Sequence, residues 1–365
     1  MTPAAAMARA LQLAERGKAS THPNPRVGCV IVRDGVVIGE GWHVSAGGPH
    51  AEVHALQAAG ERARGADVYV SLEPCAHYGR TPPCVDALIA AGAARVSAAM
   101  VDPNPKVSGR SIQKLRDAGI AAEVGLGEAE ARVLNRGFVS RFTRGRPWVT
   151  LKLAASVDGR TAMANGESRW ITGAEARADV HRLRAEAGAV LVGADTVLAD
   201  DPALTVRDWT PPDGTPLRQP DRIVVDGRAR VSAAAKVWND NGARRIRLGN
   251  VTAPGAEISG VDRIAVDTDI AGRLLLPEAL QALAAREINE VLVEAGARLG
   301  GAFLQSGLVD ELLLYVAPML LGDAARPLAV LPGLERLADA IRFEFEEVVR
   351  VGADLRIRLR PHLLS

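Results

Sequence analysis

Residues 50–92, HAEVHALQAAGERARGADVYVSLEPCAHYGRTPPCVDALIAAG, alternate between helical and strand patterns. AEVHALQAAG predicts a helix, ADVYVSL a strand, and PPCVDALIAAG a second helix with prolines in its first turn. Upstream, VGCVIVRDGVVIGEG places two β-branched runs around an Asp34-Gly35 turn, a pattern typical of a β-hairpin. Downstream, RVSAAMVD, SGRSIQKLRDAG and AAEVGLG continue the alternation. The sequence therefore predicts an α/β sandwich with helices covering a central sheet.

This first series ends in the stretch EAEARVLNRGFVSRF (128–142), which we expect to form one long helix, followed by the break TRGRP. Because glycine and proline interrupt regular structure, we predict a first domain over residues 1–145 and a second over residues 146–365. The second part again alternates strand and helix patterns, as in WVTLKLAASVDG, AVLVG, RIVVDG and INEVLVEAG. At 365 residues, each part is long enough to bury its own core.

Composition and charge exclude several classes of protein. The chain is 48% hydrophobic and 24% charged, as expected of a globular protein. A net charge of +1 disfavours a nucleic-acid binder, and three cysteines favour metal binding or catalysis in a reducing compartment over a disulfide framework. The opening MTPAAAMARALQLAERG predicts an amphipathic helix rather than a signal peptide, and no apolar run is long enough for a membrane span. We therefore expect a cytoplasmic protein with no membrane or nucleic-acid partner.

His50, Cys75 and Cys84 offer one imidazole and two thiolates, which leave a tetrahedral zinc ion with one open position. Water bound there is polarised enough to supply hydroxide near neutral pH. Glu52 follows two residues after the histidine and can pass a proton from this water to a departing amine. The combination H-x-E with P-C is the signature of zinc deaminases that act on nucleobases. We therefore predict a catalytic zinc; a structural zinc would need a fourth protein ligand, for which His77 is the near candidate.

Eight residues, AHYGRTPP, separate the two cysteines, so the loop between them is longer than in the P-C-x-x-C signature. This departure indicates a subfamily whose substrate presents a different edge to the site. This loop supplies His77 and Arg80, which can bind a ribose or phosphate group. Asn24, in THPNP, offers both donors and acceptors for a pyrimidine edge, although a turn-stabilising role accounts for it nearly as well.

The motifs THPNPRVGCVIV, PHAEVHAL and SLEPCAHYGRTPPCVDALI make the first part resemble the deaminase domain of the bifunctional riboflavin-biosynthesis enzymes. LKLAASVDGRTAMANGESRWIT, GADTVLADDPALTVR and VEAGARLGGAFL are similar to the reductase domain of the same family. The resemblance implies a cytidine-deaminase-like α/β/α sandwich followed by a dihydrofolate-reductase-like α/β domain. It also implies one Zn²⁺ per chain and NADPH. The implied reactions are deamination of 2,5-diamino-6-ribosylamino-4-pyrimidinone 5′-phosphate and reduction of its ribosyl group to ribityl.

The resemblance also implies site residues. For zinc and proton transfer they are those already identified, with Asn24, His77 and Arg80 implied for the substrate. In the second part, the positions implied for the substrate are Ser168, Arg184, Leu204, Arg207 and Glu294. Those implied for the cofactor are Ala154, Trp170, Thr196, Asp200, Gly296, Ala297, Arg298, Leu299, Gly300, Gly301 and Ala302. The chain departs from the family at Ala297 and Arg298, where proline and a small residue are usual, and at Ala154, where glycine is common.

Physical arguments support several of these positions. VLVEAGARLGGAFL reads as a strand, a glycine turn and a helix start, whose backbone N–H groups can cradle a phosphate. Arg184 and Arg207 can clamp a sugar phosphate, although each would also fit a solvated surface. Lys152 and Asp200 are placed to orient the reacting sugar carbon.

Two other functions use the same features. A nucleic-acid base deaminase with a C-terminal recognition domain would share the zinc chemistry, but it would need a basic groove with aromatic side chains. Aromatic residues make up only 4% of the chain. A zinc-stabilised binding protein with a degenerate reductase half would not need Glu52. We therefore expect an enzyme whose partner is a small-molecule substrate, with a homo-oligomer left open.

Overall fold

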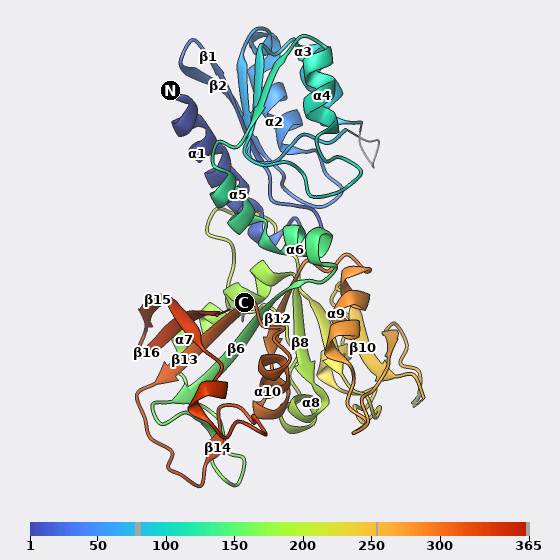
Figure 1. Cartoon of the computed structure of the whole chain (residues 1–365), viewed down its shortest axis with the longest axis vertical. Coiled ribbons are helices and arrows are strands. Elements are labelled where there is room, and N and C mark those ends of the chain that lie inside the picture. The colour runs from blue at the N-terminus through green and yellow to red at the C-terminus, as the bar shows by residue number, and fades with distance from the viewer. Residues whose placement is uncertain (77–81, 253–254, 363–365) are drawn as a thin grey trace. The chain divides into compact units, whose positions relative to one another are not determined.

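The computed structural model describes residues 1–76, 82–252 and 255–362, and it divides into two compact units (Figure 1). The first unit comprises residues 1–145 together with residues 211–217. The second comprises residues 146–210 and 218–365. His77 and Arg80 lie outside the described residues. Within the described residues, no helix combines the length and the apolar character needed to cross a bilayer.

The first unit is built on a five-stranded sheet in the order β2-β1-β3-β4-β5. β1 runs antiparallel to both β2 and β3, whereas β3, β4 and β5 are parallel. The strands are β1 (Gly28–Arg33), β2 (Val36–Trp42), β3 (Asp67–Val70), β4 (Arg95–Ala98) and β5 (Ala121–Val124). The helices are α1 (Pro3–Glu15), α2 (Ala51–Ala59), α3 (Cys84–Ala91), α4 (Arg110–Asp117), α5 (Glu128–Leu134) and α6 (Arg136–Arg144), with short 3-10 turns over Arg16–Ala19 and Gly60–Ala63.

Successive residues of β1 enter two different cores, because side chains alternate across a strand. Cys29 and Ile31 pack in the core that α2 and α3 cover, and Val30 packs in the core that α1 covers. All three are fully buried. Helices on both faces of one sheet confirm the predicted α/β/α sandwich (Figure 1).

The long helix expected over residues 128–142 is wrong, because the structure has two helices that meet at Asn135. The Asn135 side chain accepts a hydrogen bond from the Arg26 backbone N–H at 2.8 Å and donates one to the Arg26 carbonyl at 2.9 Å. Asparagine side chains readily bind backbone groups in this way and so compete with helix continuation. A contact 109 residues away in sequence therefore interrupts the helix.

A glycine lets α2 approach the hairpin closely. A Cβ atom at Gly41 would lie 2.3 Å from the Ala51 carbonyl oxygen and 2.6 Å from the Ala55 amide nitrogen, distances that no side chain tolerates. The start of α2 therefore rests directly on the backbone of β2. This close contact fixes the helix turn that begins at His50 and carries Glu52.

The second unit contains a nine-stranded sheet in the order β11-β10-β9-β8-β12-β6-β13-β16-β15. The strands from β11 to β13 are parallel, and β16 and β15 extend the sheet antiparallel. The strands are β6 (Trp148–Ser156), β8 (Ala189–Gly193), β9 (Asp221–Val225), β10 (Arg245–Asn250), β11 (Asp262–Val266), β12 (Glu290–Glu294), β13 (Glu311–Ala317), β15 (Phe343–Val351) and β16 (Asp354–Pro361). A two-stranded ribbon joins β7 (Arg160–Ala162) to β14 (Arg326–Pro327). The helices are α7 (Ala174–Ala187), α8 (Ala194–Asp200), α9 (Leu276–Ala284) and α10 (Ala297–Gln305), with 3-10 turns over Lys236–Trp238 and Leu337–Asp339.

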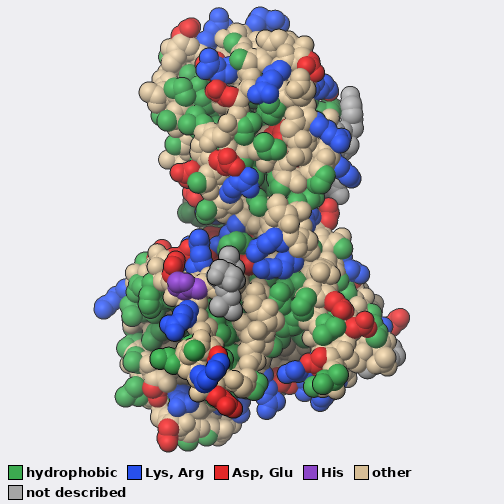
Figure 2. Space-filling model, in the orientation of Figure 1, with side chains coloured by type: hydrophobic (Ala, Val, Ile, Leu, Met, Phe, Trp, Pro, Cys, Tyr) green, Lys and Arg blue, Asp and Glu red, His purple; other side chains and the backbone are tan. Residues whose placement is uncertain are grey.

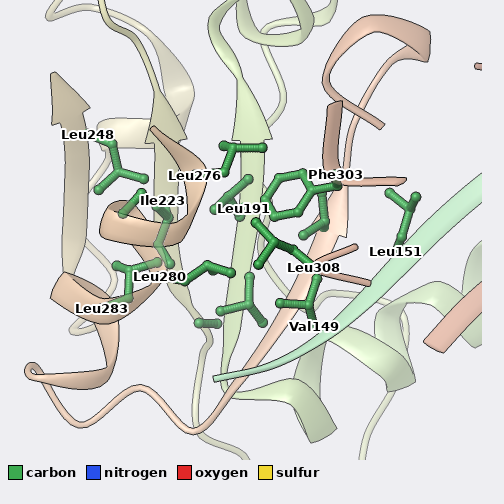
Figure 3. Close-up of a cluster of buried hydrophobic side chains, with 14 of the residues drawn as sticks. Val149, Leu151, Leu191, Ile223, Leu248, Leu276, Leu280, Leu283, Phe303 and Leu308 are labelled. Atoms are coloured by element: carbon green, nitrogen blue, oxygen red, sulfur yellow. The ribbon is translucent and has the colours of Figure 1, made fainter. Parts of the chain in front are cut away.

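Both faces of the parallel strands are buried, as expected of a parallel sheet. Leu191 of β8 packs in one core, where Figure 3 shows it near Phe303 and Leu308. Its neighbours Val190 and Val192 pack in the core on the opposite face. The chain order reverses between β8 and β12, and ligands of such sheets bind in the crevice beyond the carboxyl ends of the strands at this point.

Candidate functional site

The three predicted metal ligands meet in the first unit. His50 precedes α2 in an extended conformation, Cys75 follows β3, and Cys84 begins α3. His50 Nδ1 lies 3.1 Å from Cys84 Sγ and 3.6 Å from Cys75 Sγ, and the three ligand atoms lie within 4.8 Å of one another. One imidazole and two thiols at this spacing fit the donor set that zinc prefers.

The two thiols of this cluster have very different proton affinities. A hydrogen bond from the Cys84 thiol lowers the pKa of Cys75 to about 4. The backbone N–H of Cys84 also donates to Cys75 Sγ at 3.2 Å, as a thiolate requires. The neighbouring Cys75 sulfur and burial together raise the pKa of Cys84 far above its usual range. The pair therefore shares one proton, and a metal cation would displace it.

Glu52 lies in the first turn of α2 and is almost fully buried. Burial, reinforced by the nearby Cys75 thiolate, raises the pKa of its carboxyl to about 7. A carboxyl group that titrates near neutrality can both accept and release a proton under working conditions. The local geometry thus suits a proton shuttle.

His43 is a site residue that sequence reasoning missed. Its ring lies edge-on to the His50 ring, with 5.3 Å between centroids. Nδ1 lies 3.0 Å from the Pro49 carbonyl oxygen, and Nε2 lies 3.0 Å from Asn24 Nδ2. Because burial lowers the pKa of His43, the ring is neutral; Nδ1–H donates to the carbonyl, and Nε2 accepts from the Asn24 amide. The amide oxygen of Asn24 then points away from the histidine and can accept a hydrogen bond from a ligand.

Glu73 is a second residue that the sequence did not single out. Its buried carboxylate accepts hydrogen bonds from the backbone N–H groups of Asp102 (3.1 Å), Gly109 (2.9 Å) and Ser111 (3.2 Å), and from the Ser111 hydroxyl (2.6 Å). Four donors satisfy a buried carboxylate and fix the loop after β4 to the segment that continues into Cys75. Glu73 therefore holds in place the segment that carries Cys75 of the candidate metal cluster.

The second unit contains a cavity of about 670 Å³. It lies at the carboxyl ends of the central strands, and residues of β6, α7, α8, β12 and β13 line it. Ten of the residues that the sequence predicts line this cavity: Lys152, Ala154, Ser168, Trp170, Arg184, Thr196, Asp200, Leu204, Arg207 and Glu294. Gly296–Ala302 are not among its lining residues. Gly296, which precedes α10, nevertheless lies near the cavity wall, because a Cβ atom built on it would lie 4.0 Å from Oγ1 of the lining residue Thr196. Segments far apart in sequence thus form one site.

Arg184 and Glu294 form a buried bidentate ion pair across the cavity wall. Arg184 Nε donates to Glu294 Oε1 at 2.6 Å, and Nη2 donates to Oε2 at 3.0 Å. Arg184 Nη1 also donates to the Thr205 carbonyl at 3.1 Å. Burial raises the pKa of Glu294, but the charge of Arg184 outweighs burial and holds that pKa below its usual value. The guanidinium expected to clamp a phosphate is therefore occupied by a carboxylate.

Lys152 lines the same cavity. Burial lowers its pKa, and the nearby Glu294 carboxylate opposes this effect. Among residues 1–76, 82–252 and 255–362, no group forms a hydrogen bond with Lys152 Nζ. The ammonium hydrogens are thus available to a ligand.

Two family models match the chain, one over each part. The cytidine and deoxycytidylate deaminase zinc-binding region matches residues 2–100, and the RibD C-terminal domain matches residues 147–357. The riboflavin biosynthesis protein RibD of Escherichia coli is 52% identical over 361 residues, which are 97% of this chain and 98% of the relative. RibD of Haemophilus influenzae is 46% identical, over 97% of this chain and 96% of the relative.

Solved structures agree with these matches. RibD of Acinetobacter baumannii superposes with a TM-score of 0.91 at 46% identity, covering 98% of each chain. A diaminohydroxyphosphoribosylaminopyrimidine deaminase/5-amino-6-(5-phosphoribosylamino)uracil reductase of Thermotoga maritima superposes with a TM-score of 0.86 at 34% identity, again over 98% of each chain.

Proposed function

The chain belongs to the RibD family of riboflavin biosynthesis proteins, and we propose that the residues of its two units divide the two reactions of that family between them. It is a bifunctional enzyme, a deaminase that uses zinc and a reductase that uses NADPH. The family resemblance and the two-domain α/β fold predicted from the sequence are confirmed.

In the first unit, the assigned metal ligands are His50, Cys75 and Cys84. Zinc, when bound, supplies a water molecule that is a nucleophile at neutral pH. Glu52 takes a proton from the attacking water and delivers it to the amino group, which leaves as ammonia. Asn24, whose amide His43 orients, accepts a hydrogen bond from the pyrimidine edge. The meeting of the three ligands with a buried carboxyl group is the observation that carries this proposal.

In the second unit, NADPH would, when bound, supply a hydride to the ribosyl group. We assign the cofactor to Ala154, Trp170, Thr196 and Asp200, with a phosphate at residues 296–302, because the first turn of α10 begins there and leaves backbone N–H groups without helical partners. Lys152 donates a hydrogen bond to the opened ribosyl group beside the carbon that is reduced. Glu294, charged and fixed by Arg184, binds the sugar hydroxyls opposite. Ser168, Leu204 and Arg207 complete the substrate side of the cavity.

The substrate of this proposal is the diaminohydroxyphosphoribosylaminopyrimidine named for the Thermotoga maritima relative, and its deaminated product then enters the reductase cavity. The alternative of a nucleic-acid base deaminase lacks a recognition domain, since residues 147–357 match a reductase domain. Lys and Arg side chains are also interspersed with Asp and Glu over the face seen in Figure 2, where a nucleic-acid binder would gather positive charge.

The Lys152→Met variant tests the reductase assignment. We expect NADPH oxidation to slow by roughly 10²- to 10³-fold, because methionine keeps the length of the side chain but offers no charge or donor to the reacting group. Ammonia release should stay at the wild-type rate. The matched control is Lys114→Met, which removes an exposed lysine that pairs with Asp86 in the first unit. A Lys152→Met enzyme that oxidises NADPH at the wild-type rate would refute the assignment.

We propose further that the chain forms a homo-oligomer through the outer strands of its larger sheet. Phe345 and Val348 are 72% and 55% exposed on the edge strand β15, and Leu355 of β16 is also exposed. The strand register places all three on one face of the sheet. An exposed apolar face at an open sheet edge is typical of an interface between chains. We expect light scattering to give a multiple of the 38.4 kDa chain mass for the wild type and a smaller mass for Phe345→Glu. Equal masses for the two proteins would contradict this interface.

We propose a cytoplasmic location on the basis of the same chemistry. The two cysteine ligands must stay reduced to bind metal, and none of the three cysteines is in a disulfide. Recovery of the native enzyme from a membrane or extracellular fraction would contradict this proposal.

A further inference from the structure

A buried tyrosine lies beneath the reductase cavity, and the proposed chemistry does not use it. Tyr315, on β13, is fully buried and is among the residues that line the cavity. Its hydroxyl donates a hydrogen bond to Asp179 Oδ2 on α7 at 2.6 Å. Asp179 also accepts from Arg182 at 2.6 Å and from Arg356 of β16 at 2.7 Å. A carboxylate held by three donors from three elements leaves the phenol little freedom to move.

The fixed ring lies next to Lys152. The Lys152 ammonium nitrogen lies 5.8 Å from the centre of the Tyr315 ring, within the range of a cation–π interaction. The two residues are diagonal neighbours on adjacent parallel strands, because Tyr315 pairs with Ala154 and Lys152 pairs with Leu313. The ring face is therefore presented to the ammonium by the backbone register as well as by the hydrogen bond to Asp179.

Three groups, each on a different element, set the charge of Lys152. Burial lowers the pKa of the amine; the charge of Glu294 on β12 opposes this effect, and the charge of Arg184 on α7 reinforces it. The negative face of the Tyr315 ring adds to the effect of Glu294. Glu294 is shared between Lys152 and Arg184, with which it forms an ion pair. Among the described residues, the Tyr315 ring faces no cation other than Lys152.

We propose that Tyr315 is a positioning residue of the reductase site, whose ring, anchored by Asp179, keeps the Lys152 ammonium charged and directed at the substrate. This inference rests on the proposed role of Lys152. Tyr315 touches neither reacting group and acts through the lysine alone.

Fluorination of the ring separates this role from a merely structural one. Tyr315→Phe removes the hydroxyl and keeps the ring, whereas 3,4,5-trifluorophenylalanine at position 315 keeps the shape and cancels much of the negative charge of the ring face. We expect Tyr315→Phe to lower the melting temperature, because Asp179 loses a donor, and to leave the pH profile of NADPH oxidation in place, because the strand register still presents the ring to Lys152. The fluorinated enzyme should lose activity at an alkaline pH about 0.5 to 1 unit lower, because its Lys152 deprotonates more easily.

The matched control is Tyr69→Phe, which changes the buried tyrosine of the first unit and should shift no pH profile. An unchanged profile in the fluorinated enzyme, or an equal shift in Tyr315→Phe, would overturn the role of the ring. The proposed function would survive either result if Lys152→Met still slows NADPH oxidation to the extent expected above. Wild-type reduction by Lys152→Met would instead remove the premise.

Discussion

Replacing Glu52 by glutamine is expected to slow ammonia release by roughly 10²- to 10⁴-fold, the contribution usual for a general acid–base group. Glutamine keeps the shape of the side chain and its place in the first turn of α2, but it cannot carry a proton. Reduction of substrate that is already deaminated should proceed at the wild-type rate, since no residue of this cluster is among the described residues that line the cavity of the second unit. The measurement is the rate of ammonia release and of NADPH oxidation by the same preparation.

Glu40→Gln is the control for this variant, because it removes a carboxylate of the same unit that pairs with Arg9 and takes no part in the cluster. Its ammonia release should match the wild type. Zinc content must also be measured, and it should be equal in all three proteins. A Glu52→Gln enzyme that keeps zinc and releases ammonia within about tenfold of wild type would contradict the proton shuttle.

Removing one thiolate ligand should have a still larger effect. We expect Cys84→Ala to lower the zinc content from about one ion per chain to near zero, because two remaining ligands cannot complete a tetrahedral site. Ammonia release should then fall below detection, with NADPH oxidation of deaminated substrate preserved. Both are measured on protein purified without added metal.

Cys29→Ala is the matched control, since Cys29 is buried in the core of the same unit and is not a ligand. It should lose some stability and keep its zinc. Full zinc content in Cys84→Ala would show that the metal lies elsewhere, and the assigned cluster would then be wrong.

The candidate metal cluster was predictable because two of its three ligands, His50 and Cys75, belong to short motifs. His50 and Glu52 are two residues apart at a helix start, and Cys75 follows a proline at a strand end. The alternation of strands and helices then brings these ends together, as it does in any α/β sandwich. The local sequence pattern and the topology agree here, so the sequence was sufficient to predict the cluster.

The partners of these residues were not predictable in the same way. His43 reaches Asn24 across 19 residues, and Glu73 reaches Ser111 across 38. No spacing rule links such positions, because they meet through tertiary packing. The same limit explains Arg184: its residue type suggested a phosphate, but Glu294, 110 residues later, occupies its guanidinium.

In the fold, too, features set by local sequence were predictable, whereas features set by long-range contacts were not. The sequence predicts both series of strands and helices and the hairpin around Asp34, each from local periodicity. It does not predict the interruption at Asn135, because that residue binds the backbone of Arg26 near the start of the sheet. Nor does periodicity reveal that residues 211–217 group with the first unit.

A coupled assay of the wild-type enzyme tests the central claim most directly. The zinc-loaded chain is given diaminohydroxyphosphoribosylaminopyrimidine and NADPH, and ammonia and NADPH are followed together. We predict that ammonia appears first and that one NADPH is then oxidised for each ammonia released. NADPH oxidation without ammonia, or ammonia release that is never followed by NADPH oxidation, would contradict the account of two cooperating sites in one chain.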